Sequence, residues 1–263
     1  MLLELLEDAG YSVNLTAKSR YMKGLVPLLG GQFTLDLLKQ PDILRLFSNA
    51  QIRKGTAYNL KQLAQIANPQ QEMPRFMAQM KTLAASSTLI RGYRLQCPTC
   101  DLDTWYALDD VAEIVLCEGC RTTFQLPLDV EFAFRPNRLL IEALKSGALT
   151  VLLTLNHWLH DYPVTVWQSN IEVSQENIMT DIDLLVQRED GLYMAECKDN
   201  LETDSEYLQN LELRLAVANR IASDIGATFV FATLYDVNLP NNLQSFLDER
   251  QIKILTKADL LRS

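Results

Sequence analysis

The chain has 263 residues, of which 48% are hydrophobic and 22% are charged. This is the composition of an ordinary globular protein, and it excludes a collagen-like or largely disordered chain. The length suits one large domain or two to three small ones. The net charge of −9 is uneven: residues 161–263 hold 18 acidic and 8 basic side chains, a balance of −10, whereas residues 1–160 hold 15 and 16, a balance of +1.

An acidic second half repels nucleic acid, so we expect any binding of nucleic acid to depend on the first half, on metal ions or on a partner. The first ten residues lack the basic start and long apolar core of a signal peptide. The longest apolar run, near residues 148–155, is shorter than the roughly 20 residues that span a bilayer. We therefore expect a cytoplasmic protein without a membrane partner. The chain starts inside an expected helix, as a fragment of a longer protein would.

Residues 1–92 are expected to form a small helical module. Apolar residues recur at helical spacing in five segments, and turn-like residues such as Gly30-Gly31 separate them. A winged-helix or helix-turn-helix core over residues 43–67 is one interpretation, and a helical packing or assembly domain is the other. The five segments are Met1–Ala9, Phe33–Leu38, Ile43–Phe47, Leu60–Ile66 and Phe76–Leu83, and the basic residues that would suit DNA are Lys18, Arg20, Lys23, Arg53, Lys54, Arg75 and Lys81.

Residues 93–127 contain two C-x-x-C pairs. Cys97 and Cys100 form the first pair, and Cys117 and Cys120 form the second after sixteen residues. Zinc prefers four soft ligands in a tetrahedron, and two such pairs supply them without leaving an open position. The segments between and after the pairs predict short strands at 105–108, 112–116 and 121–126. We therefore expect a zinc ribbon with one structural Zn²⁺, followed by a connector over residues 127–136.

From residue 137 the pattern changes to alternating helices and strands. The expected order after two initial helices is three strands, a long helix, a strand, a helix, a short strand and a last helix. The long helix begins at an expected capping box, Thr203-Asp-Ser-Glu206. This order predicts an α/β domain over residues 137–263, with a mixed sheet that is antiparallel first and parallel beyond.

One β-hairpin in this domain carries unexpected polar groups. Its strands are residues 181–186 and 192–198, and Asp190-Gly191 favours the turn. Glu196 and Lys198 share a face because side chains alternate along a strand. Asp183 lies opposite Glu196 if residues 189–190 form the turn, and opposite Lys198 if residues 190–191 do. The alternative interpretation is a surface ion pair on an edge strand.

The hairpin and its surroundings resemble the restriction-endonuclease-like superfamily, whose nucleases are named for the PD-(D/E)xK motif. The resemblance is carried by Asp183, by Glu196-Cys197-Lys198, and by the capped helix and buried strand that follow. It covers residues 137–263, about half of the chain. One departure is Ile182, which stands where the motif has proline.

The resemblance implies a metal-dependent phosphodiesterase. Asp183 and Glu196 would hold Mg²⁺ or Mn²⁺ together with the main-chain carbonyl of Cys197. Lys198 would orient the attacking water and stabilise charge that develops in the transition state. The Cys197 side chain is expected to be buried on the opposite face of the sheet.

Nucleases of this superfamily often carry one more acidic residue on the first helix of the core. Glu142 is the favoured candidate, and Glu172 at the end of the first strand is its competitor. Asp181 could assist the metal or lie at the rim, and Gln209 on the long helix is a further candidate.

The leading hypothesis is therefore a nuclease in a defence or repair role, for which the resemblance favours DNA as substrate and leaves RNA open. We expect control by homo-oligomerisation or by a protein partner, because an unregulated nuclease would harm its host. The alternative from another class is a non-catalytic adaptor that binds nucleic acid or protein through the ribbon and the helical module. A third hypothesis is a DNA-binding regulator that uses the hairpin domain as a sensor.

Overall fold

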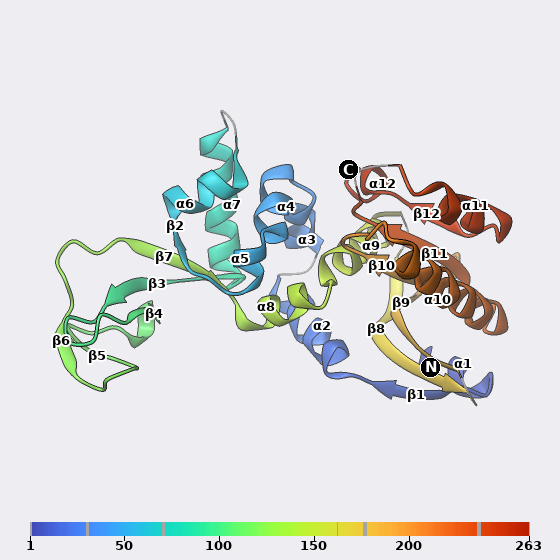
Figure 1. Cartoon of the computed structure of the whole chain (residues 1–263), viewed down its shortest axis with the longest axis horizontal. Helices are drawn as coiled ribbons and strands as arrows, with labels where there is room; N and C mark the ends of the chain where they lie inside the picture. The colour runs from blue at the N-terminus through green and yellow to red at the C-terminus, as the bar shows by residue number, and fades with distance from the viewer. Residues whose placement is uncertain are drawn as a thin grey trace. The chain divides into compact units, whose positions relative to one another are not determined.

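The structure is a computed structural model, and it describes residues 2–29, 32–69, 72–161, 163–175, 178–235 and 238–262. The chain forms two compact units (Figure 1). The first, which we call the sheet unit, contains the chain up to Leu25 and from Ser146 onward; the second, the ribbon unit, is Val26–Lys145. This division differs from the expected boundaries, because the first 25 residues pack with the second half of the chain. The expected turn at Gly30-Gly31 lies outside the described residues.

A mixed six-stranded sheet forms the centre of the sheet unit, in the order β1-β8-β9-β10-β11-β12 (Figure 1). The pairs from β1 to β10 are antiparallel, and β10-β11 and β11-β12 are parallel. The predicted change from antiparallel to parallel pairing is therefore confirmed. The strands are β1 (Ser12–Leu15), β8 (Val164–Gln175), β9 (Ile178–Arg188), β10 (Gly191–Lys198), β11 (Thr228–Thr233) and β12 (Lys253–Leu255).

Helices flank both faces of this sheet, and they are α1 (Leu2–Asp8), α9 (Ala148–Asp161), α10 (Ser205–Asp224), α11 (Asn241–Glu249) and α12 (Lys257–Leu260), with α2 (Ala17–Leu28) beginning in the unit. Neighbouring residues of β10 point to opposite faces, and Cys197 contacts Thr154 of α9 whereas Glu196 contacts Arg214 of α10. Helices α9 and α10 therefore cover opposite faces. Among the described helices none is by itself long and apolar enough to cross a bilayer, and only the bent pair Arg138–Lys145 and Ala148–His160 passes that test when joined.

Helix α10 covers the hairpin because its apolar residues recur on one stripe. Leu208, Leu211 and Leu215 are buried, and they join the main core of the unit. The expected capping box at Thr203 is wrong. The N-cap is Asp204, whose side chain accepts the amide of Tyr207 at 2.9 Å. Tyr207 occupies the position where a capping box needs Glu or Gln, so the reciprocal bond is not made.

Strand β1 is a member of the sheet that the sequence did not predict. It has only four residues, and their burial alternates between exposed and half-buried. Its partner β8 lies more than 150 residues away, with Asn14 paired to Glu172. An edge strand this short has too little periodicity to be recognised in isolation, and the pairing partner supplies the missing information.

The ribbon unit combines helices with two small sheets, in the orders β2-β7-β3-β4 and β5-β6. Four of the five expected helical segments lie in this unit and are helical, and the fifth, over residues 1–9, contains helix α1 of the sheet unit. Helices α2 and α5 were not expected. The interpretation of residues 127–136 as a connector is wrong in its second half, because β7 pairs with β2 and β3. The elements are α3 (Gln32–Leu38), α4 (Pro41–Ser48), α5 (Ala50–Arg53), α6 (Leu60–Ala67), α7 (Met73–Ala85) and α8 (Arg138–Lys145), with β2 (Tyr58–Asn59), β3 (Leu89–Gln96), β4 (Asp103–Ala107), β5 (Ile114–Leu116), β6 (Thr123–Gln125) and β7 (Phe132–Pro136).

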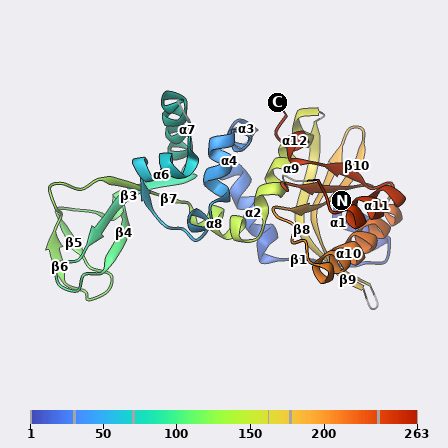
Figure 2. The same cartoon turned by 45° about the horizontal axis from the view of Figure 1, so that its top comes forward.

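Two antiparallel hairpins carry the cysteine pairs. Hairpin β3-β4 ends at the pair Gln96↔Asp103, and hairpin β5-β6 ends at Leu116↔Thr123. Each C-x-x-C pair is therefore the turn of one hairpin, and Figure 2 shows the two hairpins side by side in green. The observed strands are shifted by one or more residues from the expected ones, because each strand ends where its knuckle begins.

Candidate metal-dependent active site

The turn of the β9-β10 hairpin fixes the register of the site. Arg188 pairs with Gly191, so Glu189 and Asp190 form the two-residue turn. The buried Arg188 guanidinium donates to both carboxylate oxygens of Asp190, at 2.8 and 2.6 Å, and these bonds hold the Asp190 pKa down to about 2. Of the two registers open from the sequence, this turn selects the one that places Asp183 opposite Glu196.

The strands stop pairing just before the polar residues. The last pair is Leu184↔Ala195, and beyond it the Cys197 amide donates to Asp183 Oδ2 at 2.8 Å instead of to the backbone of β9. A side chain thus replaces the main-chain partner at this point. Strand β8 is also irregular here, since Asn170 has a φ of +50°.

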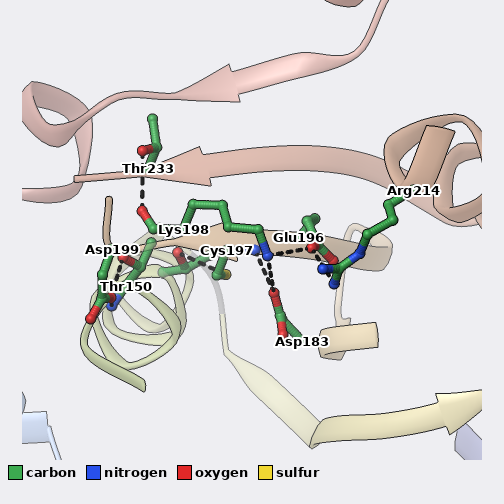
Figure 3. A network of polar contacts seen from close by, with 9 residues as sticks. Thr150, Asp183, Glu196, Cys197, Lys198, Asp199, Arg214 and Thr233 are labelled. Atoms are coloured by element: carbon green, nitrogen blue, oxygen red, sulfur yellow. Dashed lines mark hydrogen bonds and ion pairs between the residues drawn. The ribbon is translucent and has the colours of Figure 1, made fainter. Parts of the chain in front are cut away.

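The three predicted residues converge at this end of the hairpin. Lys198 Nζ lies 2.6 Å from Glu196 Oε1 and 4.0 Å from Asp183 Oδ2 (Figure 3). Glu196 is only 2% exposed and lies on β10, between β9 and β11. The alternative interpretation as a surface ion pair on an edge strand is therefore wrong.

A cation that was not predicted completes the cluster. Arg214 of α10 donates to Glu196 Oε1 at 3.0 Å, so this oxygen binds both Lys198 and Arg214 (Figure 3). Arg214 lies three residues after the buried Leu211 and next to the buried Leu215, so helical spacing places it beside the apolar stripe of α10. That spacing was the available signal, but an arginine at such a position is normally a solvated one.

The electrostatics of the cluster follow from burial and from its own charges. Burial raises the pKa of Asp183 to about 7, and the charge of Glu196 adds to this rise. Burial lowers the pKa of the Lys198 amine, but the carboxylates of Glu196 and Asp183 outweigh it, so this pKa is raised. Lys198 therefore stays charged at neutral pH, and one of the two carboxylates titrates near neutrality.

The main chain at the end of β10 is anchored on both sides. The Lys198 carbonyl accepts from Thr233 Oγ1 and from the Leu234 amide, both at 3.1 Å. Asp199 accepts the amide and hydroxyl of Thr150 at the start of α9, at 2.9 and 2.7 Å (Figure 3). These four hydrogen bonds fix the position of the end of β10.

The Cys197 side chain is buried on the opposite face, as expected. Its Sγ lies 3.7 Å from Thr154 Oγ1, and burial raises the pKa of the thiol well above its usual value. A neutral, buried thiol is a poor nucleophile. Cys197 therefore contributes to the site through its main chain rather than through its side chain.

The additional acidic candidates have different locations. Glu142 lies on α8 in the ribbon unit, where its Oε1 accepts from Lys145 at 3.2 Å. Glu172 lies on β8 of the sheet unit, accepts from Asn14 at 2.9 Å and pairs across the strands with Asp181. Asp181 and Asp183 share a face of β9, so the register places Glu172 on the face of the sheet that carries Asp183. Gln209 is exposed on α10.

The four predicted zinc ligands also meet. Cys97, Cys100, Cys117 and Cys120 place their sulfur atoms within 4.8 Å of one another, and all four are free thiols. The Cys97–Cys120 and Cys100–Cys117 sulfur distances are 3.6 and 3.7 Å. Four thiolates at about 2.3 Å from a zinc ion lie about 3.8 Å apart, so the cluster has the size of a tetrahedral zinc site.

The two knuckles share one backbone conformation. Asp101 donates its amide to the Cys97 carbonyl and has a φ of +57°, and Arg121 does the same to Cys117 with a φ of +62°. Burial raises the pKa of the Cys97 thiol, but amide hydrogen bonds from Thr99 and Cys100 outweigh it and lower this pKa to about 6. At Cys100 an amide hydrogen bond from Leu102 lowers the pKa, but side-chain bonds from the other cysteines outweigh it and raise the pKa to about 11. Amides directed at sulfur favour the thiolate form that binds metal. The geometry and the donor set thus fit Zn²⁺.

Comparison with known proteins gives little further information. No family model matches the chain, and no curated protein matches it. Protein VC1899 of Vibrio cholerae aligns with 99% of this chain and 58% of its own, at 12% identity and a TM-score of 0.45. Can2 of Sulfobacillus thermosulfidooxidans, solved in complex with cyclic tetra-adenylate, aligns with 99% of this chain and 59% of its own, at 12% identity and a TM-score of 0.48. The chain thus spans less than three fifths of the length of either protein, and similarities of this size carry no argument about its function.

Proposed function

We propose that the protein is a metal-dependent nuclease with a restriction-endonuclease-like core in its sheet unit. The observation that carries this proposal is the convergence of Asp183, Glu196 and Lys198 at the point where β9 and β10 stop pairing. Two acids in a largely buried place are costly unless cations accompany them. Lys198 and Arg214 provide two positive charges, and a divalent ion would provide more.

The oxygen atoms of the site suit Mg²⁺ or Mn²⁺. Within the described part of the chain, Asp183 Oδ1 and Glu196 Oε2 have no hydrogen-bond donor, and hard divalent cations prefer such carboxylate oxygens. In a strand, the amide and carbonyl of one residue point toward the same neighbour. The Cys197 amide points toward Asp183, so its carbonyl is the main-chain oxygen best placed to join them.

Each residue then has a distinct role. A divalent ion at this site would neutralise phosphate charge and acidify a bound water. Asp183, Glu196 and the Cys197 carbonyl would hold that ion. Lys198, kept charged by its carboxylate neighbours, orients the water and stabilises negative charge in the transition state. We retain Glu142 as a proposed additional acid, with Glu172 as its competitor.

DNA is the favoured substrate and RNA the second, in a defence or repair role. The excess of acidic residues after position 160 argues against strong intrinsic binding by the sheet unit. We propose that the basic residues of the first half and the zinc ribbon bind the nucleic acid. We also propose that a partner or a second copy of the chain controls cleavage. The zinc ion has a structural role in this scheme.

A cleavage assay tests the proposal. Supercoiled plasmid, single-stranded DNA and single-stranded RNA are incubated with zinc-loaded protein in Mg²⁺ or Mn²⁺. We expect cleavage that requires the added ion and is lost in Asp183→Asn and Glu196→Gln. Glu249→Gln is the matched control, because it removes an exposed carboxylate on α11 that has no proposed role in the site. No cleavage of any substrate by the wild type, or equal cleavage by all variants, would contradict the proposal.

A further inference from the structure

Arg214 is a charged group at the site that the roles above leave unexplained. It comes from α10 rather than from the hairpin, and it shares Glu196 Oε1 with Lys198, at 3.0 Å against 2.6 Å. The two cations differ in exposure: the Arg214 side chain is 47% exposed, and the Lys198 side chain is 19% exposed. Arg214 can therefore leave the carboxylate for solvent more easily than Lys198 can.

The charges of the cluster balance without any added ion. Asp183 and Glu196 carry two negative charges when ionised, and Lys198 and Arg214 carry two positive ones. A divalent ion between the carboxylates would leave an excess of two positive charges, which repels the nearest cations. Lys198 lies beside both carboxylates, whereas Arg214 pairs with Glu196 alone of the two. Arg214 is thus the cation that we expect to leave the carboxylate when the ion binds.

A displaced Arg214 would still lie at the edge of the site. Its guanidinium has five N–H donors, and the ion pair with Glu196 is its only hydrogen bond among the described residues. The planar fork of donors matches two oxygens of a phosphate group. The loss of its carboxylate partner would free this fork at the moment when the metal site becomes positively charged.

We propose that Arg214 is a placeholder cation that neutralises Glu196 in the metal-free protein, leaves that carboxylate when a divalent ion binds, and then holds a phosphate oxygen of the substrate. This proposal rests on the proposed nuclease function. In this proposal Arg214 binds the substrate, whereas Lys198 and the ion would act on the reacting atoms.

The first test measures the binding of Mn²⁺ alone by calorimetry, with zinc-loaded protein. Removal of the competing cation in Arg214→Ala is expected to tighten Mn²⁺ binding about five- to tenfold, at the lower end of typical couplings between sites. Arg214→Lys keeps the charge and should bind Mn²⁺ as the wild type does. Arg220→Ala is the control, because Arg220 lies on the same helix and pairs with Asp224 instead. Equal or weaker Mn²⁺ affinity in Arg214→Ala would overturn the placeholder role.

The second test uses thermal unfolding and cleavage kinetics. Arg214→Ala should lower the melting temperature of the metal-free protein more than that of the Mn²⁺-saturated protein, because the ion replaces the missing cation. In cleavage, the KM for DNA should rise more than kcat falls, and Arg214→Lys should restore part of the KM. An equal loss of stability with and without Mn²⁺ would show a purely structural role and would also overturn the proposal.

The outcomes separate this inference from the nuclease proposal. Tighter Mn²⁺ binding in Arg214→Ala without cleavage by the wild type would support the placeholder and reject the nuclease. Normal cleavage with unchanged Mn²⁺ affinity would do the reverse. A wild type that binds no Mn²⁺ at this site would overturn the placeholder.

Discussion

The end of β10 and the cysteine cluster are both candidate metal sites, but the chain supports them in different ways. At the end of β10, protein atoms hold each group: the Cys197 amide binds Asp183, and Thr233 and Leu234 bind the Lys198 carbonyl. The cysteine cluster lies at the turns of two short hairpins, whose buried core consists of Leu95, Tyr106 and Val115 with half-buried neighbours.

The two sites therefore differ in what holds their residues in position. The sheet unit buries a large apolar core around β10, and hydrogen bonds from protein atoms hold the residues of its site. The hairpins bury too little apolar surface to be stable on their own, so their ligand must supply folding free energy. Removal of metal should therefore unfold the ribbon and leave the β10 site intact.

The largest effect is expected at the cysteine cluster. Cys97→Ser or Cys117→Ser should abolish binding of one zinc ion per chain, because structural zinc contributes about 10–16 kcal/mol of binding free energy in small modules. Residues 93–127 should then become accessible to protease and exchange their amide hydrogens rapidly. Elemental analysis and hydrogen exchange measure the two effects. Cys197→Ser is the matched control, and loss of zinc in that variant would contradict the assignment.

The next effect concerns pH and Asp183. The folded pKa of Asp183 is about 7, above the ordinary aspartate value of 3.8. The sign follows from proton binding: a raised acid pKa stabilises the folded state at low pH, and this stabilisation is lost as pH rises toward 7, by up to about 1.4 kcal/mol per pH unit. Wild-type protein without added Mg²⁺ or Mn²⁺ should therefore lose stability from pH 5 to 7 relative to Asp183→Asn.

Thermal unfolding of both proteins at several pH values measures this difference, in chelator-free buffer so that the zinc stays bound. Added Mn²⁺ should stabilise the wild type more at pH 7.5 than at pH 5.5, because the ion competes with the proton at Asp183. Parallel stability curves for wild type and Asp183→Asn would contradict the raised pKa. Asp181→Asn is the control, and its curve should follow the wild type.

A smaller effect is expected from Cys197→Ala. Only the main-chain carbonyl of this residue is proposed to hold the metal ion, so cleavage and Mn²⁺ binding should persist. Loss of the buried sulfur and its contact with Thr154 should lower the free energy of unfolding by about 1 kcal/mol. Denaturant unfolding and cleavage rates measure the two quantities. Loss of cleavage with the fold intact would show that the thiol takes part.

The smallest effect concerns the additional acid. Glu172 lies on the same sheet and pairs across the strands with Asp181, so Glu172→Gln should weaken Mn²⁺-dependent cleavage a few-fold. Glu142→Gln should break the pair with Lys145 and change stability by less than about 1 kcal/mol, as exposed ion pairs do. Cleavage rates of the two variants decide between the candidates. A larger loss in Glu142→Gln would identify Glu142 as the additional acid, and a larger loss in Glu172→Gln would identify Glu172.

The elements that the sequence predicts well are those with a strong local pattern. The spacing of the four cysteines, the apolar stripe of α10 and the hairpin around Asp190 each determine a local structure, and all three are observed. The alternation of side chains along β10 is also a local rule, and it alone is enough to separate Glu196 and Lys198 from Cys197.

The missed features depend on partners that are distant in sequence. Strand β1 forms because it pairs with β8. Arg214 belongs to the site because it binds Glu196, eighteen residues earlier on another element. Local patterns contain none of these contacts.

The most direct test of the nuclease site is single-turnover cleavage by Lys198→Ala in saturating Mn²⁺. Removal of one charge-stabilising group should lower the rate about 10²- to 10³-fold, while Mn²⁺ still binds because Asp183 and Glu196 remain. Lys253→Ala, an exposed lysine on β12, should cleave at the wild-type rate. Equal rates for Lys198→Ala and Lys253→Ala would contradict the assignment of the active site to the end of β10.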